Sequence, residues 1–493
     1  MARRRILSEP ATRLLMPLTH QTRSRSKRRA GAVACLLFAG AFWGCQSYER
    51  RPLEAAGARD AWLARSPNDE PVREFARRLA QRSAEPIAFD PSDGLTLAEG
   101  EVVALVFNPD LRLARLEAGV AQASAPYAGL WQDPVLGVDM ERIVRGADGA
   151  NPWVAGGTIG LTIPLSGSLE AAKATADARA RAELDAVLAR EWATRAALRE
   201  LWIEWSASRL RAEIGRDLIV RLRAIAALAQ RQEQAGTLTR LDARLFRVEL
   251  VGREADQIGL ESRERELSLQ LRAMMGLSPA AALTLEPTVT FAGPAVDDEA
   301  SLRSALEASS PELAAVRARY EVAEQSLRTE VRKQYPDLVF GPGYGSDQGD
   351  DRVLLGVQLP LPLWNRNRRG VAEATAQREA ARGRFETTYE QLASRLAIAL
   401  ERSRSGRAQR EMVESVVVPL AEEQESDARR IAELGRVDPL LLLESLKAQH
   451  AARVRLIEAR TAEAIGAVRL AELIGPVSAG TPATSPTDAE SQP

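Results

Sequence analysis

Two segments of the chain place apolar side chains at every second position. In residues 154–165 they are Ile159, Leu161, Ile163 and Leu165, and in residues 353–361 they are Val353, Leu355, Val357, Leu359 and Leu361. This period of two is typical of β-strands with one apolar face. Each segment follows a polar, turn-rich loop and a shorter predicted strand, at 135–142 or at 338–345, so the sequence predicts two hairpins.

The predicted strands have the length of strands that cross a membrane in a barrel, which is ~9–11 residues. Aromatic residues lie near both ends of the hairpins: Trp131, Tyr335 and Trp364 at one end, Trp153 and Tyr344 near the other. Such girdles mark the two membrane–water interfaces of outer-membrane barrels. The alternative is a pair of soluble hairpins with one core face.

Long helices are predicted at 168–233, 240–275, 367–434 and 439–474. In the first of them apolar positions step by three and four residues, at Ile203, Ala207, Leu210, Ile214, Leu218, Leu222 and Ile225. One helical face is therefore apolar. Charged residues fill the other faces, so these helices need to pack side by side, as in a coiled coil. Pro419 interrupts the third helix and is expected to kink it.

The order of these elements occurs twice along the chain. Asn108-Pro109-Asp110-Leu111 recurs as Ser310-Pro311-Glu312-Leu313, about 200 residues later. Gly236 and Gly276 recur at the same spacing as Gly435 and Gly475. The chain therefore contains two repeats, at 95–279 and 297–476.

The number of strands predicts an assembly. A sheet edge in lipid must be closed, because lipid cannot hydrogen-bond it. Two hairpins give four strands, whereas transmembrane barrels have at least about eight. Three chains would supply twelve. The predicted fold is thus mainly α with β: a duplicated strand–strand–helical hairpin unit, trimeric, with a 12-stranded transmembrane β-barrel continued by a periplasmic α-helical barrel.

The N-terminus has the pattern of an export signal. Basic residues at 23–29 precede an apolar run at 30–43, which ends in Gly44-Cys45. A small residue before a cysteine resembles the lipobox of bacterial lipoproteins. We therefore expect a lipoprotein signal peptide at 1–44, started at Met1 or Met16, and lipid attachment at Cys45 in the outer membrane. The alternative is an ordinary leader with an unmodified cysteine.

Two further segments flank the repeats. Residues 45–94 are polar and arginine-rich and are expected to form a periplasmic lead-in. Residues 477–493 are rich in serine, threonine, proline and alanine and are expected to be disordered.

Composition excludes several kinds of function. The 66 basic and 67 acidic residues give a formal net charge of -1, which gives no reason to expect a nucleic-acid partner. With Cys35 in the leader and Cys45 as the lipid site, the mature chain has no disulfide and no thiolate metal site. The two histidines, His20 and His450, form no metal site, and no nucleophile motif occurs. No enzyme activity and no cofactor are expected.

The turns between the paired long helices are the candidate channel tips. They contain Gly236 and Gly435, followed by Arg240 and Asp242 in the first repeat and by Arg436 and Asp438 in the second. These four charged residues are candidates for a constriction. The competing interpretation is helix capping, by Asp438 before a proline and by Thr239 with Asp242.

Two motifs resemble a known family. The stretch from Leu95-Thr96-Leu97 to Asn108-Pro109-Asp110-Leu111 is similar to the opening of TolC-like outer-membrane efflux proteins. The tract from Leu359 to Arg368, followed by Gly370, resembles the second-half signature of their cobalt–zinc–cadmium resistance branch. The first repeat departs from it, with Ser166-Gly167-Ser168 in place of the Pro-Leu-Trp run.

This resemblance implies a passive conduit for small molecules or heavy-metal cations. The conduit would be a homotrimer in outer-membrane lipid, working with a periplasmic adaptor protein and an inner-membrane RND-type pump. Two alternatives stay open. An adaptor protein would have one helical hairpin between β domains, and an exported coiled-coil scaffold would have no lipid-facing strands.

Overall fold

The computed structural model describes residues 47–82, 89–145, 152–294, 298–347, 350–433 and 438–476. It forms two units, which divide after Arg59. The described part of the first unit is exposed and includes the start of helix α2 (Ala55–Leu63). The predicted signal peptide, Cys45 and the predicted tail lie outside the described residues.

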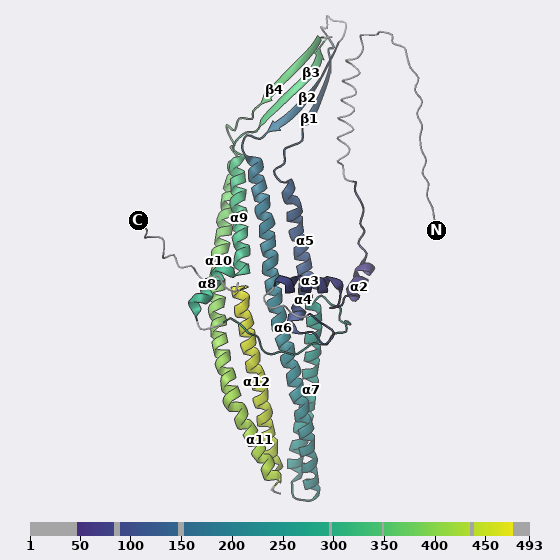
Figure 1. Cartoon of the computed structure of the whole chain (residues 1–493), viewed down its shortest axis with the longest axis vertical. Helices are drawn as coiled ribbons and strands as arrows, with labels where there is room; N and C mark the ends of the chain where they lie inside the picture. Colours follow the sequence, from purple (N-terminus) through teal and green to yellow (C-terminus); the bar gives the residue numbers. More distant parts are fainter. Residues whose placement is uncertain are drawn as a thin grey trace, which may run out of the picture. The chain divides into compact units, whose positions relative to one another are not determined.

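The second unit contains both repeats, in the order drawn in Figure 1. Helix α3 (Glu70–Arg82) precedes them. The first repeat comprises α4 (Leu97–Phe107), α5 (Pro109–Ser124), η1 (Ala125–Tyr127), β1 (Val135–Arg142), β2 (Trp153–Ile163), α6 (Ser168–Gln234) and α7 (Arg240–Met274). The second comprises α8 (Glu299–Ser309), α9 (Pro311–Arg332), β3 (Leu338–Asp347), β4 (Asp350–Gln358), α10 (Arg368–Met412), the π-helical turn η2 (Val413–Val417), α11 (Val418–Glu433) and α12 (Pro439–Ile474).

The recurring sequence motifs begin corresponding helices. The Asn108 side chain accepts a hydrogen bond from the Leu111 amide at 3.0 Å, with Pro109 in the first helical position of α5. Ser310 and Pro311 begin α9 in the same way, although the Ser310 hydroxyl makes no capping bond. Proline is tolerated there because its missing N–H would have no partner within the helix.

The four strands form one antiparallel sheet in the order β1–β2–β3–β4. The pairing of β2 with β3 joins the two repeats, with Leu161 opposite Phe340. Two predicted boundaries were wrong. β2 ends at Ile163 and β4 at Gln358, so Leu165 and Leu359 lie outside their strands. Proline cannot donate to a strand ladder, which explains why both strands stop before one.

Helices α6 and α10 run from one end of the sheet, and α7 and α12 pack beside their far halves (Figure 1). Helix α6 has 67 residues and contacts α5, α7, α9 and α12, while α10 contacts α9 and α12. The predicted apolar face of α6 is largely confirmed, since Ile203, Ala207, Leu218 and Leu222 are buried. No helix among the described stretches has both the length and the apolarity needed to cross a membrane.

The predicted single helix at 367–434 is interrupted. Helix α10 ends at Met412, the π-turn η2 follows, and α11 continues the path from Val418. Pro419 has no N–H to donate to the turn before it and crowds that turn with its ring. A π-turn relieves this crowding by widening one turn. The helix therefore continues, but its backbone hydrogen-bond pattern changes locally.

Candidate functional site

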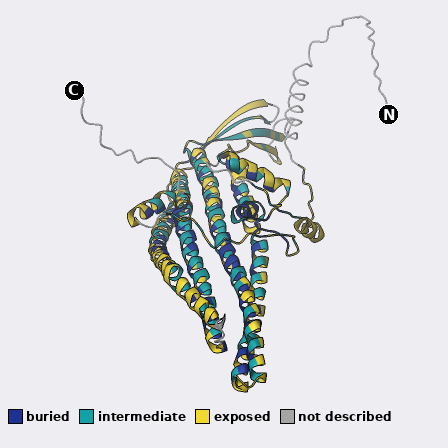
Figure 2. Cartoon of the chain, turned by 60° about the horizontal axis from the view of Figure 1, so that its bottom comes forward, coloured by how far each residue is buried: buried dark blue, intermediate teal, exposed yellow. Residues whose placement is uncertain are grey.

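One face of the sheet is apolar and exposed. The strand register places every second residue of each strand on this face. Its exposed apolar members are Leu136, Val138, Met140, Ile159, Tyr344, Val353, Leu355 and Val357. Val353 is 85% exposed and Val138 72%, and Figure 2 shows strands of the sheet coloured as exposed. We call these eight residues the apolar sheet face.

The opposite face of the sheet is rich in glycine and polar residues. It carries Gly137, Asp139, Gly156, Thr158, Gly160, Thr162, Gly341, Gly343, Gly345, Arg352, Gly356 and Gln358. At Gly343 an added Cβ would lie 2.8 Å from the carbonyl oxygen of Gly157. A side chain would therefore be crowded at Gly343, whereas an added Cβ at Gly160 or Gly341 would make only ordinary contacts at 3.7 Å.

The turn after α6 is closed by its own backbone. The amides of Thr237 and Leu238 both donate to the Gln232 carbonyl, at 3.0 and 3.2 Å. Gly236 has a φ of 73°, in the left-handed region, and an added Cβ would contact nothing. Glycine is thus needed here for backbone conformation rather than for space.

The predicted tip residues lie at helix starts. Thr239 caps α7, and its hydroxyl donates to the Asp242 carboxylate at 2.6 Å. Arg240 is 79% exposed and approaches Glu233 at 3.8 Å. Asp438 caps α12 by accepting from the Leu440 amide at 2.9 Å.

Asp438 is therefore engaged in capping, whereas among the described residues the Asp242 side chain binds only the hydroxyl of the capping Thr239. Gly435 and Arg436 lie outside the described residues. In the described chain no hydrogen bond or ion pair joins Arg240 or Asp242 to Asp438.

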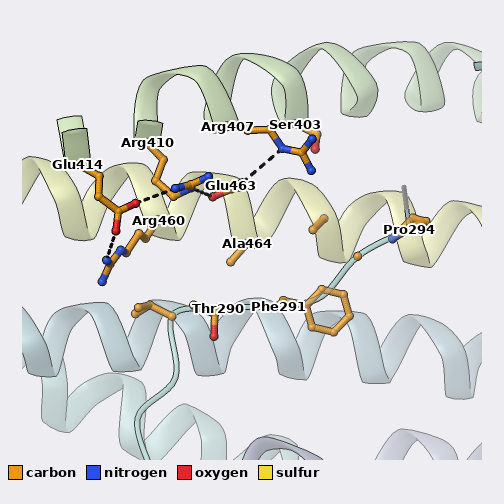
Figure 3. Close-up of a pocket in the computed structure, with 13 residues that line it drawn as sticks. Thr290, Phe291, Pro294, Ser403, Arg407, Arg410, Glu414, Arg460, Glu463 and Ala464 are labelled. Carbon is orange, nitrogen blue, oxygen red and sulfur yellow. Dashed lines mark hydrogen bonds and ion pairs between the residues drawn. The ribbon is translucent and has the colours of Figure 1, made fainter. Parts of the chain in front are cut away.

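A pocket of about 470 Å³ lies where the π-turn meets α12 and the segment 289–294 (Figure 3). Four charged side chains on its wall form a chain of ion pairs. Glu414 of η2 binds Arg410 at 2.7 Å and Arg460 at 2.6 Å, and Arg410 also binds Glu463 at 2.5 Å. Each of these arginines has a carboxylate partner, so the network holds α12 against the π-turn.

A second pocket contains His450. It lies between α6, α7 and α12, and its lining includes Arg253, Asp256 and Gln257. Burial, together with the positive charges of Arg253 and Arg453, lowers the pKa of His450. The expectation of a packed histidine thus fits its surroundings, and the described residues contain no cluster of side chains suited to hold a metal ion.

The second repeat matches a known protein family. Residues 302–476 match the model of the family described as outer membrane efflux protein. The cobalt-zinc-cadmium resistance protein CzcC of Cupriavidus metallidurans is 28% identical over 239 residues. That match covers 47% of this chain and 56% of CzcC, so it spans little more than half of the relative. The second repeat is therefore similar to outer membrane efflux proteins.

Solved structures of such proteins share the fold. The structure of CusC matches 80% of this chain and 98% of its own, with a TM-score of 0.65 at 16% identity. The outer-membrane channel OprN matches 78% and 94%, with a TM-score of 0.66 at 17% identity. VceC of Vibrio cholerae matches 77% and 96%, with a TM-score of 0.63 at 19% identity. The resemblance to TolC-like efflux proteins is confirmed.

The sequence missed one buried charge cluster of this efflux-protein fold. Glu101 of α4, only 7% exposed, receives the guanidinium groups of Arg195 and Arg199 from α6. The spacing of these residues along the chain gave no signal, because glutamate and arginine are frequent on every helix. The cluster fixes α4 against α6 and lies away from both candidate tips.

Proposed function

We propose that the chain is the outer-membrane channel subunit of a tripartite efflux system. Three copies would close a 12-stranded transmembrane barrel and continue it as a helical tube through the periplasm. The single observation that carries this proposal is the apolar sheet face, which is exposed to solvent in one chain although it is apolar over four strands. Water disfavours such a surface, whereas lipid does not.

The topology of the sheet favours closure between copies. Strands β1 and β4 are the two edges of the described sheet, and neighbouring strands are antiparallel throughout. Because each copy contributes an even number of strands, β4 of one copy can pair with β1 of the next without breaking the alternation. The glycine-rich face would then line the lumen.

The helices also present surfaces for neighbouring copies. On α7 an exposed apolar stripe is formed by Leu241, Leu245, Val248 and Ile258. Such a stripe is stabilised when a helix of another copy covers it.

The remaining parts of the proposal come from the relatives. The cargo would be heavy-metal cations, as the name of CzcC suggests, or other small molecules. A periplasmic adaptor protein and an inner-membrane RND-type pump would supply that cargo, and the chain itself would act without catalysis. We also propose that Cys45 carries lipid and that Arg240, Asp242, Arg436 and Asp438 narrow the tip while Asp438 caps its helix.

The test compares the two faces of β4. Arginine at the middle of a bilayer costs about 2–4 kcal/mol on a lipid-facing strand position. Val353→Arg with Leu355→Arg should therefore abolish assembly in the outer membrane. Leu354→Arg, between them but on the glycine-rich face, should leave a trimer that conducts ions in planar bilayers.

The assay is light scattering of detergent-extracted membranes together with single-channel conductance. A wild-type monomer in the soluble periplasmic fraction would rule out the channel and leave the coiled-coil scaffold. Metal tolerance of cells that express the chain together with an RND-type pump and its adaptor then tests the cargo.

A further inference from the structure

The segment between β4 and α10 combines exposed apolar and cationic side chains. Leu361 is 64% exposed and Trp364 85% exposed. Arg366, Arg368 and Arg369 follow directly and are exposed too. We call residues 361–369 the basic junction. It lies at the helical end of the sheet, next to the apolar sheet face (Figure 1).

The basic junction is held in a defined conformation. Arg366 and Asn367 have φ values of 44° and 49°. Residues other than glycine rarely adopt this left-handed backbone conformation. The Asn367 amide anchors it by donating to both the carbonyl oxygen and the carboxylate of Glu330 on α9, each at 2.8 Å. Arg366 therefore lies in an anchored turn, and Arg368 and Arg369 follow it as the first residues of α10.

Within the described residues no carboxylate neutralises these charges, although Arg366 Nε donates to the backbone carbonyl of Pro362 at 3.2 Å. Arg366, Arg368 and Arg369 form no ion pair within the described residues, and residues 352–372 contain no aspartate or glutamate. The first turn of α10 has no acidic residue. Cations in a first turn oppose the helix dipole, so the arginines do not stabilise α10 either.

The first repeat shows that the fold does not require them. Its corresponding junction, Ser166-Gly167-Ser168, has no arginine, and Glu170 lies in the first turn of α6. Gly167 takes the left-handed conformation there without strain. The basic junction is therefore a property of the second repeat alone.

We propose that the basic junction binds the anionic headgroups of phospholipids at the periplasmic surface of the outer membrane. This inference rests on the proposed function, because it requires the apolar sheet face to lie in lipid. Tryptophan prefers the depth at which hydrocarbon meets headgroups. Guanidinium groups donate several hydrogen bonds to one phosphate, and basic residues next to a membrane attract anionic lipid.

Arg332 extends the basic surface. It lies on the last turn of α9, two residues beyond the Glu330 that anchors Asn367, and is exposed. Lys333 is neutralised by Glu330 at 2.6 Å, so it adds no net charge. Three copies would place three such surfaces around the barrel.

The experiment uses the full-length protein in detergent and measures its apparent affinity for fluorescent phosphatidylglycerol. Replacing all three arginines by glutamine should weaken binding by roughly five-fold for each arginine removed. The matched control replaces Arg384, Arg402 and Arg404, which are exposed on α10 farther along the helix and form no ion pair in the described chain. This control should bind like the wild type.

Two further arms complete the test. Lysine in place of the three arginines keeps the charge and should restore most of the affinity, which separates a charge effect from misfolding. Inorganic phosphate should not compete, since the surface requires a headgroup at a membrane. Equal binding by the glutamine variant and the wild type would overturn the inference, as would competition by phosphate.

Insertion into lipid vesicles separates the two proposals. Wild-type protein that inserts equally well into phosphatidylcholine vesicles with and without phosphatidylglycerol, and binds both lipids alike, overturns this inference alone. Wild-type protein that inserts into neither overturns the proposed function as well.

Discussion

The two repeats share their order of elements but differ in how their long helices are built. In the first repeat α6 runs without a break for 67 residues. In the second, the corresponding path changes to a π-turn at Val413–Val417, ahead of Pro419. The second repeat accommodates Pro419 by this wider turn, and the ion pairs of Glu414 with Arg410 and Arg460 hold the turn in place.

The repeats also differ in the depth of their cores. Trp202 of α6 is fully buried under α4, where Gly100 leaves it space, and its indole N–H donates to the Glu286 carbonyl at 2.9 Å. The core of the second repeat is made of smaller side chains, such as Leu396 and Leu400. The first repeat thus has the larger buried side chains in its core.

The largest expected effect comes from that core. Trp202→Ala should lower the free energy of unfolding by about 4–5 kcal/mol, because it removes a large side chain and leaves a cavity. Leu400→Ala, in the core of the second repeat, should cost about 2–3 kcal/mol. Denaturant unfolding followed by circular dichroism measures both. A larger loss for Leu400→Ala would break the comparison.

The next largest difference between the repeats is expected when one ion pair is broken in each. Glu101→Gln should cost about 3 kcal/mol, because it leaves the nearly buried Arg199 without its charged partner. Glu312→Gln, which removes the partner of Arg395 on α10, should cost less than about 1 kcal/mol, because both side chains are about half exposed. Melting temperatures of the two variants should rank in this order, and equal values would contradict it.

Replacing a glycine by alanine should have opposite effects on stability in a turn and in a helix. Gly236→Ala should cost about 1 kcal/mol, because its φ of 73° disfavours a side chain. Gly383→Ala, in the middle of α10 with open space around it, should instead stabilise the protein by up to about 1 kcal/mol. Opposite signs in the unfolding free energy are expected, and a loss at both positions would be the contrary result.

The smallest expected effect is a dependence of stability on pH. It arises at His450, where a helix of the second repeat packs on helices of the first. His450 of α12 faces Arg253 of α7 and Asp217 of α6, and its pKa is lowered in the folded state. Because the unfolded chain then binds the proton more tightly, stability is full above pH ~6.5 and decreases as the pH falls below it. His450→Gln should remove this component from the pH profile of the melting temperature, and an unchanged profile would refute it.

Much of this fold could be predicted from residue periodicity. The alternation at Leu355 and Val357 identified the hairpins, and the stepping of Ile203 and Leu218 identified the buried face of α6, because both patterns are local. The pairing of β2 with β3 could not be predicted, since strands that lie far apart in the sequence leave no local signal of their register. The exact place of the π-turn was also missed, because proline marks a disturbance but not how the helix absorbs it.

The candidate sites were harder to predict than the fold. Gly236 and the capping Asp438 were recognisable because each has a local conformational reason. The uncompensated charge of Arg366, Arg368 and Arg369 is not visible in the sequence, because partners from any other helix could have neutralised it. Only the arrangement of the neighbouring side chains shows that none does so among the described residues.

The open edges of the sheet have a consequence for the making of this protein in the cell. A single copy that has not yet met its partners presents β1 and β4 as unpaired strands beside an apolar surface. Such edges recruit any extended chain and favour aggregation. In the proposed channel, a newly exported copy would therefore need an escort across the periplasm. If three copies close a barrel as proposed, a gene copy that lacks β4 alone should act as a dominant mutation, because its product would still offer β1 to normal subunits but would prevent the ring from closing.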